Sequence, residues 1–206
     1  MAVGPGDGPP ARAVELRMDR GHQEQIAPLV RQSLIESDIR ISEITRIGAT
    51  VGPGSFTGLR VGLAFVRAFA MARGIECVGV TTLEALASEA SPQGLVLTAI
   101  RCRGDLYYVQ LYRDGAPAMA PDVLGLHEIA ARIVEVGAGD PVTLVGPEVE
   151  GLLDFAPAST ALVRTHVTGA VLHRKISAAA PGATPRPLYM RPPDARTLVE
   201  RQARGG

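Results

Sequence analysis

A glycine-rich bend in the first half of the sequence is the stretch best suited to chemistry. It consists of Gly52, Pro53, Gly54, Ser55, Phe56, Thr57 and Gly58. Apolar segments on both sides predict a strand before the bend and a helix after it. Backbone N–H groups at the start of such a helix favour an anion such as phosphate. The glycine spacing is neither a dinucleotide fingerprint nor a P-loop, so a tight turn without a ligand remains an open alternative.

Apart from the bend, the sequence shows no constellation typical of catalysis. Histidines stand at positions 22, 127, 166 and 173, and no two have the close spacing of a metal pair on a helix. The two cysteines, Cys77 and Cys102, offer no zinc spacing and suit a reducing cytosol. Ser55, considered as a protease nucleophile, has no His and Asp in evident support. We therefore predict no catalytic residue and no metal site.

The helix after the bend is expected over 59–73. The glycines let the backbone take a positive φ or approach another group closely, Ser55 and Thr57 are natural helix caps, and Gly74 is placed to end the helix. Its sequence is apolar nearly all round. One face can pack on a sheet, so the rest needs another helix or a partner protein. A fully internal helix is the alternative.

The rest of the chain predicts alternating strands and helices. Strands are expected at 13–18, 44–51, 75–80, 94–100, 106–112, 119–124, 142–145 and 161–163. Helices are expected at 22–37, after a capping box at Thr81 and Glu84, and at 126–136, 148–153 and 169–180. The two halves show the same series if the first lacks two opening strands, which predicts a duplicated α/β arrangement.

Four regions follow from these patterns. Residues 1–11 are rich in Gly and Pro and are expected to be disordered. Residues 12–92 form the first subdomain, which is incomplete, and residues 93–181 form the second. Residues 182–206 form a basic tail rich in Pro and Arg, expected to be solvated.

Composition excludes several classes of protein. Basic and acidic residues number 21 each, so the formal net charge is zero, which argues against a stand-alone nucleic-acid binder. Arginines interrupt the longest apolar run, so we predict no membrane span. The N-terminus does not have the pattern of a secretory signal, and a cytoplasmic protein is expected.

Four segments together resemble a known family. The run from Gly52 to Gly62 resembles the signature of the TsaB (YeaZ) family, which acts in making threonylcarbamoyladenosine in tRNA. The runs Arg20-Gly21-His22, Gly79 to Ala87 and Pro187 to Arg191 resemble other segments of that family. The resemblance implies an α/β, actin-like ATPase (ASKHA, ribonuclease H-like) fold with two similar subdomains.

The resemblance also implies a role and a surface. The family's role is that of a non-catalytic subunit that pairs with the transferase TsaD, helped by the ATPase TsaE, while TsaD modifies the adenosine next to the anticodon. It implies an association surface formed by His22, Ile26, Leu29, Val30, Arg60, Leu63, Val66, Arg67 and Ala70. The chain would contact tRNA only through the complex and would bind no cofactor on its own, with ATP or ADP at the partner boundary left open. A homodimer through the same helices is the alternative without the partner.

The sequence departs from the family pattern at its start. The family begins with an apolar strand that ends in Asp-Thr and pairs with a second strand, and nothing similar precedes Ala13. We therefore expect the first subdomain to be truncated at its N-terminus and the chain to be poorly soluble alone. Two other interpretations stay open: a small actin-like phosphotransferase, ATPase or protease-like enzyme that uses the glycine bend, and a degenerate remnant without function.

Overall fold

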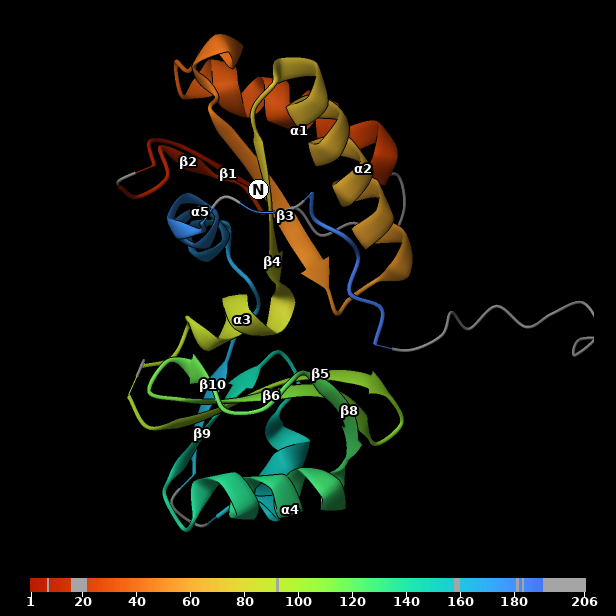
Figure 1. Ribbon diagram of the computed structural model, residues 1–206, viewed down its shortest axis with the longest axis vertical. Coiled ribbons are helices and arrows are strands. Elements are labelled where there is room, and N and C mark those ends of the chain that lie inside the picture. The colour runs from red at the N-terminus through yellow and green to blue at the C-terminus, as the bar shows by residue number, and fades with distance from the viewer. Residues whose placement is uncertain are drawn as a thin grey trace, which may run out of the picture.

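The molecule contains two main sheets, one above the other in Figure 1, each with helices beside it. The structure is a computed structural model and describes residues 1–6, 8–15, 22–91, 93–157, 160–180, 182 and 184–190. We call the part around the two-stranded parallel sheet the first half, and the part around the six-stranded sheet the second half.

The first half is built on two parallel strands. β3 (Arg46–Gly52) pairs with β4 (Glu76–Thr81). Parallel neighbours need a long crossover, which here is α2 (Phe56–Arg73), packed against β3. α1 (His22–Glu36) lies beside α2 (Figure 1), and the short 3₁₀ helix η1 (Ile41–Glu43) leads from it toward β3.

The N-terminal residues pair with one another, which differs from the disorder expected for residues 1–11. β1 (Ala2–Val3) forms an antiparallel pair with β2 (Arg12–Ala13), and the amine of Met1 donates to the carbonyl of Val14 at 2.7 Å. Local backbone pairing thus overrides a composition typical of turns. Of the strand expected over 13–18, only its first residue lies in β2, and residues 16–18 lie outside the described part of the chain.

A six-stranded sheet forms the second half. Its order is β10-β9-β5-β6-β7, and β8 also pairs with β6. β5 and β6 form an antiparallel hairpin, whereas β5, β9 and β10 are parallel. The strands are β5 (Leu95–Arg103), β6 (Leu106–Arg113), β7 (Ala116–Pro117), β8 (Asp122–Gly125), β9 (Val142–Gly146) and β10 (Ala161–Arg164). All except β7 were predicted to within a few residues.

The main core lies in the second half. α4 (Leu126–Gly137) and the 3₁₀ helix η2 (Glu150–Phe155) pack on one another, with α4 below the sheet in Figure 1. Ile129 and Ile133 of α4 and Leu152 of η2 join β-strand residues in a cluster of thirteen buried side chains. The clusters around β3 and β4 contain only three and four. Because apolar burial is the chief stabilising contribution, the second half holds the larger share of the stabilising core.

The helix that ends each half packs against the other half. These helices are α3 (Thr82–Ala87) and α5 (Gly169–Ala178). α3 follows β4, yet its Leu86 lies in a cluster with Val96 and Val145 of the second half. α5 follows β10, yet its Val171 lies in a cluster with Val78 of β4. Each half therefore contributes a helix to a hydrophobic cluster of the other half.

Arg46 ties α5 to the first half. Its Nη1 donates to the carbonyls of Ile176, Ser177 and Ala179 at 3.0, 2.8 and 2.8 Å, and its Nε donates to Glu76 at 2.7 Å. Carbonyls at the end of a helix lack partners within the helix. One guanidinium therefore caps α5 while it bridges β3 and β4.

Candidate docking surface at the glycine-rich bend

Caps at both ends fix the helix that follows the bend. The N–H of Gly58 donates to Oγ of Ser55 at 3.3 Å, so α2 begins at Phe56 rather than at residue 59. At the other end, Gly74 takes a left-handed conformation with φ 64°, as predicted. Because Ser55 already accepts from Gly58, the bend offers fewer free donors than its sequence suggests. An anion site there stays a prediction.

Only one of the three glycines in the bend is required by the backbone. Gly52 has φ 118°, and a Cβ added there would lie 2.8 Å from the carbonyl oxygen of Leu188. Gly54 has open space around it, and Gly58 has only ordinary contacts. Gly52 therefore permits the C-terminal segment to approach the bend.

The C-terminal segment 184–190 packs against the bend and α2. The N–H of Leu188 donates to the carbonyl of Val51 at 2.7 Å, and its side chain joins the cluster around Leu63 and Val66. Nε of Arg67 donates to the carbonyl of Pro185 at 2.8 Å. We expected residues 182–206 to be a solvated tail. Residues 184–190 are packed instead, because α2 offers apolar contacts and the Arg67 donor, and β3 offers the Val51 carbonyl as an acceptor.

Three side chains form a cluster over the first turns of α2. Nε of Arg60 donates to the hydroxyl of Tyr189 at 2.9 Å, and its guanidinium carbon lies 3.8 Å from the ring centroid of Phe56. The rings of Phe56 and Tyr189 are 5.3 Å apart. Phe56 is 37% exposed and Tyr189 is 46% exposed. We call these three residues the Arg60 cluster. Sequence reasoning did not include Phe56 or Tyr189 in the association surface.

α2 has two apolar faces, and only one is covered. The buried face consists of Leu59, Val61, Leu63, Val66 and Ala70. The exposed face contains Phe56, Arg60, Ala64, Ala68 and Met71, spaced three or four residues apart. Met71 is 84% exposed. The helix is therefore neither fully internal nor open on all sides.

Three of the predicted association residues lie on the buried face. Leu63, Val66 and Ala70 are nearly inaccessible, and the first two pack with Val51 of β3. They cannot meet a partner on the surface of this chain. Arg67 is half-buried, and Arg60 is exposed. The sequence showed a helix that is apolar nearly all round, which does not show which side faces the sheet.

The predicted residues of α1 are less accessible than expected. Ile26, Leu29 and Val30 are half-buried, and the side chain of His22 lies outside the described residues. Ile35 is the large apolar side chain that α1 exposes. α1 therefore contacts α2 but does not add a second broad exposed apolar face.

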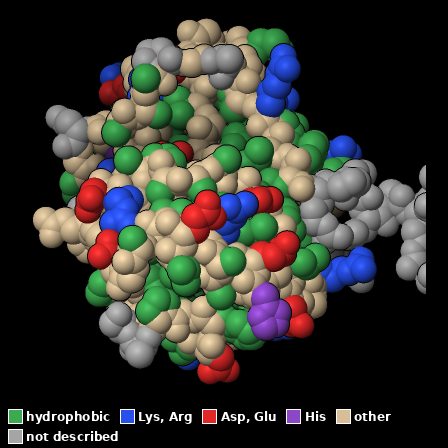
Figure 2. Space-filling model, turned by 60° about the horizontal axis from the view of Figure 1, so that its bottom comes forward, with side chains coloured by type: hydrophobic (Ala, Val, Ile, Leu, Met, Phe, Trp, Pro, Cys, Tyr) green, Lys and Arg blue, Asp and Glu red, His purple; other side chains and the backbone are tan. Residues whose placement is uncertain are grey.

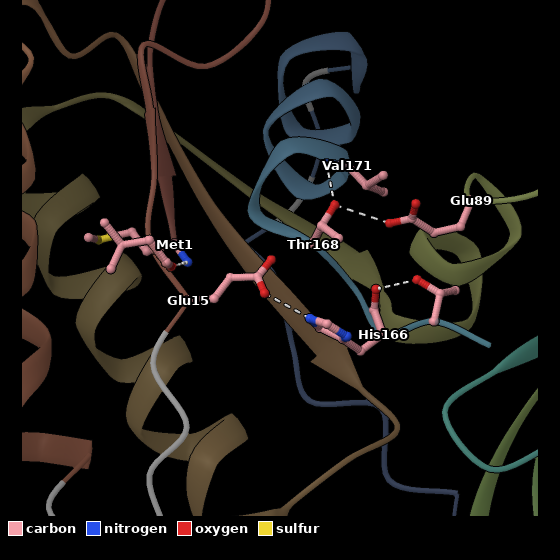
Figure 3. A network of polar contacts seen from close by, with 8 residues as sticks. Met1, Glu15, Glu89, His166, Thr168 and Val171 are labelled. Atoms are coloured by element: carbon pink, nitrogen blue, oxygen red, sulfur yellow. Dashed lines mark hydrogen bonds and ion pairs between the residues drawn. The ribbon is translucent and has the colours of Figure 1, made fainter.

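Two of the described histidines make structural contacts, and one cysteine is partly buried. Nε2 of His166 lies 2.8 Å from a carboxylate oxygen of Glu15, and this hydrogen bond lowers the pKa of Glu15 (Figure 3). His127 packs edge-on against Phe155, and burial raises the pKa of the Cys77 thiol. Within the described ranges, no three His, Cys, Asp or Glu side chains are grouped to hold a metal ion.

A buried polar chain crosses the sheet of the second half. The hydroxyl of Tyr112 donates to Oε1 of Gln110 at 2.6 Å, and the hydroxyl of Thr98 donates to the carbonyl of Gln110 at 3.2 Å. Burial raises the pKa of Tyr112 well above its ordinary value of 10.0. This network fixes β5 against β6 and satisfies side chains that burial would otherwise penalise.

The face turned forward in Figure 2 intersperses acidic and basic side chains among hydrophobic ones. Opposite charges also meet in ion pairs such as Arg113 with Asp140 and Arg132 with Glu135. Among the described helices, none combines the length and the hydropathy that a bilayer crossing requires.

Sequence comparisons connect the chain with proteins of tRNA modification. The family model described as "TsaD: tRNA N6-adenosine threonylcarbamoyltransferase" matches residues 16–130. The TsaB protein of Escherichia coli, named for tRNA threonylcarbamoyladenosine biosynthesis, is 33% identical over 99 residues, which cover 46% of this chain and 43% of that protein. The uncharacterized protein Rv3421c of Mycobacterium tuberculosis is 32% identical over 87% of this chain and 80% of its own length. This chain spans 47% of the uncharacterized protein ML0378 of Mycobacterium leprae, to which it is 31% identical.

Solved structures agree on the fold. YeaZ from Pseudomonas aeruginosa superposes with a TM-score of 0.67 at 24% sequence identity, over 84% of this chain and 86% of that one. The predicted α/β fold of the actin-like ATPase type is thereby confirmed. The chain belongs to the TsaD family, and within it is a TsaB-like (YeaZ-like) protein.

Proposed function

We propose that this chain is a non-catalytic subunit in the synthesis of threonylcarbamoyladenosine in tRNA, and that it pairs with a TsaD-like transferase. Membership in the TsaD family and similarity to a protein named for this pathway support the pathway. The exposed face of α2 supports the subunit role. A TsaE-like ATPase completes the proposed assembly, and tRNA is bound through the complex.

One observation carries the subunit role. α2 carries a continuous exposed stripe, and its opposite face is packed in the core. The apolar residues of the stripe are Phe56, Ala64, Ala68 and Met71. Contiguous exposed apolar surface of this kind marks protein interaction sites. The two alanines allow another helix to approach closely, while Phe56 and Met71 supply the large apolar side chains found at interface centres.

Co-purification with a TsaD-like subunit from the same genome tests the proposal. Ala68→Asp and Met71→Asp each place a charge on the exposed stripe without entering the core, so binding should be lost while the melting temperature changes little. Val66→Asp is unsuitable for this purpose, since Val66 is buried and the variant would unfold.

The matched control is Val134→Asp, which charges another well exposed apolar residue, in α4, that is 69% exposed. It should co-purify like the unmodified chain. Reconstitution with the TsaD-like and TsaE-like proteins and tRNA, followed by mass spectrometry of nucleosides, should show modification that depends on the chain and fails with Met71→Asp. Unchanged co-purification of both stripe variants, or modification without the chain, contradicts the proposal.

A further inference from the structure

Arg60 is an exposed cation at the centre of the Arg60 cluster, and no carboxylate of the described residues pairs with it. α2 contains Arg60, Arg67 and Arg73 and no Asp or Glu. Arg67 donates to the carbonyl of Pro185, and Arg73 donates to the carbonyl of Ser42. Arg60 donates to a neutral phenol, and among the described residues it has no acidic partner. Within the described ranges, the positive charge on the exposed face of this helix is therefore unmatched.

The Arg60 cluster holds this guanidinium in one orientation. Nε is bound to the Tyr189 hydroxyl, and the plane lies against the Phe56 ring. A guanidinium has five N–H donors, so one contact leaves the two terminal NH₂ groups available. Arginine fixed in this manner is suited to a two-point contact with a carboxylate, and it loses little side-chain entropy when it binds.

The surroundings favour a protein as the source of that carboxylate. Ala64, Ala68 and Met71 continue the exposed face beyond the Arg60 cluster, and they carry no hydrogen-bonding side chain for a nucleic-acid backbone. Aromatic residues and arginine next to apolar surface are typical of the residues that dominate binding energy at protein interfaces. Charge complementarity then requires an acidic residue opposite Arg60.

We propose that Arg60 pairs with a carboxylate on an apolar helix of the partner protein, and that Tyr189 is the positioning residue that orients it. The inference rests on the proposed function, because the partner meant is the TsaD-like subunit. The C-terminal segment thereby becomes part of the docking surface. Its Leu188 is anchored on β3, which fixes Tyr189 over α2.

Titration of the full chain with the TsaD-like subunit, at low and at high ionic strength, tests this pairing. Arg60→Met keeps an unbranched apolar side chain and removes the charged guanidinium group. It should weaken binding about tenfold or more at low ionic strength, and it should flatten the salt dependence, because the screened charge is gone. Arg132→Met, an exposed arginine of α4, is the matched control and should bind like the unmodified chain.

Tyr189→Phe tests the positioning role. It keeps the ring and removes the hydroxyl that receives Nε, so binding should weaken about threefold. On an Arg60→Met background the same change should have no further effect, since Tyr189 acts through Arg60. Thermal melting of each variant shows whether the fold is intact.

Three results would overturn the inference. The first is that Arg60→Met binds as tightly as the unmodified chain. The second is a loss of affinity that is the same at every ionic strength and accompanies a lower melting temperature. The third is intact partner binding with a weaker affinity of the complex for tRNA, which would assign Arg60 to phosphate. Failure of the unmodified chain to bind the TsaD-like subunit would refute the proposed function itself.

Discussion

The two halves of the molecule repeat one order of elements but complete their sheets differently. Each half contains the series helix, strand, helix, strand, helix. In the first half the series is α1, β3, α2, β4 and α3, and in the second half it is α4, β9, η2, β10 and α5. β3–β4 and β9–β10 are both parallel pairs. β9 has β5 on its other edge, whereas β3 pairs with no further strand among the described residues. In the described part of the chain, β9 therefore has a strand on both sides, whereas β3 lies at a sheet edge.

The strand ends show the same contrast at single residues. β3 ends in Val51-Gly52-Pro53, and β9 ends in Val145-Gly146-Pro147. A Cβ on Gly146 would overlap the carbonyl oxygen of Ala99 in β5, while a Cβ on Gly52 would meet that of Leu188. The C-terminal segment thus occupies beside β3 a place that β5 occupies beside β9. An open strand edge invites association, so poor solubility of the isolated chain stays a prediction.

The largest expected effect compares these two glycines. Gly146→Ala should lower the free energy of unfolding by about 3 to 4 kcal/mol, because β5 cannot move away from the added methyl group. Gly52→Ala should cost about 2 kcal/mol, because the segment carrying Leu188 can shift. Urea denaturation measures both values. Equal costs would mean that the C-terminal segment is as rigid as a central strand.

The two cores give the next comparison. Leu144→Ala, at a fully buried position in β9, should cost about 3 kcal/mol through lost burial and a cavity. Ile47→Ala, at a half-buried position in β3, should cost about 1 kcal/mol. The same denaturation measurement applies. A larger loss for Ile47 would reverse the assignment of the main core to the second half.

Arg46 tests the tie between the halves. Arg46→Met leaves the carbonyls at the end of α5 without their shared donor, and we expect a loss of about 1 to 2 kcal/mol. Hydrogen exchange should quicken mainly in α5, β3 and β4. Arg40→Met, which removes an exposed pair with Glu43, is the control and should change stability little. Equal effects of the two variants would show that the tie contributes nothing.

The smallest effect at neutral pH concerns Tyr112. Burial raises its pKa in the folded chain, while the unfolded chain keeps the ordinary value of 10.0. Above pH 10 the unfolded form loses the proton first, so stability should fall as pH rises, with no such change below pH 9. Tyr112→Phe should cost about 1 kcal/mol at pH 7 and lose part of the alkaline dependence. An unaltered alkaline slope in the variant would assign the dependence to other groups.

Local chemistry was predictable from the sequence. Gly74 ends α2, and Thr81 caps α3, where its hydroxyl accepts from the N–H of Glu84 at 3.0 Å. Both caps depend only on residues a few positions away in the sequence. Ser55 was recognised as a cap, although the start of α2 was placed three residues too late. The alternation of strands and helices was also sufficient to predict the duplicated α/β arrangement.

Long-range contacts were not predictable in the same way. Tyr189 and Arg60 lie 129 positions apart, and no periodicity connects them. Tyr189, the aromatic residue of the Pro187–Arg191 motif, was the signal in the sequence for this contact. Only the fold shows that it lies over α2. Val66 was included in the association surface that the family resemblance implied, and a helix that is apolar nearly all round does not show which of its sides packs on the sheet. The paired Val-Gly-Pro strand ends were visible in the sequence and would have aligned the two halves.

The exchange of α3 and α5 has a consequence for cutting the chain. A break between Ser91 and Gln93 would leave the N-terminal fragment with α3, which contributes to the other fragment's interior, and would remove α5 from the strands that it shields. Neither fragment would fold stably alone, yet each would expose the surface that packs against the other. Two such fragments expressed together should assemble into one folded protein, so a peptide bond at this point is not required, whereas the contact between the fragments is.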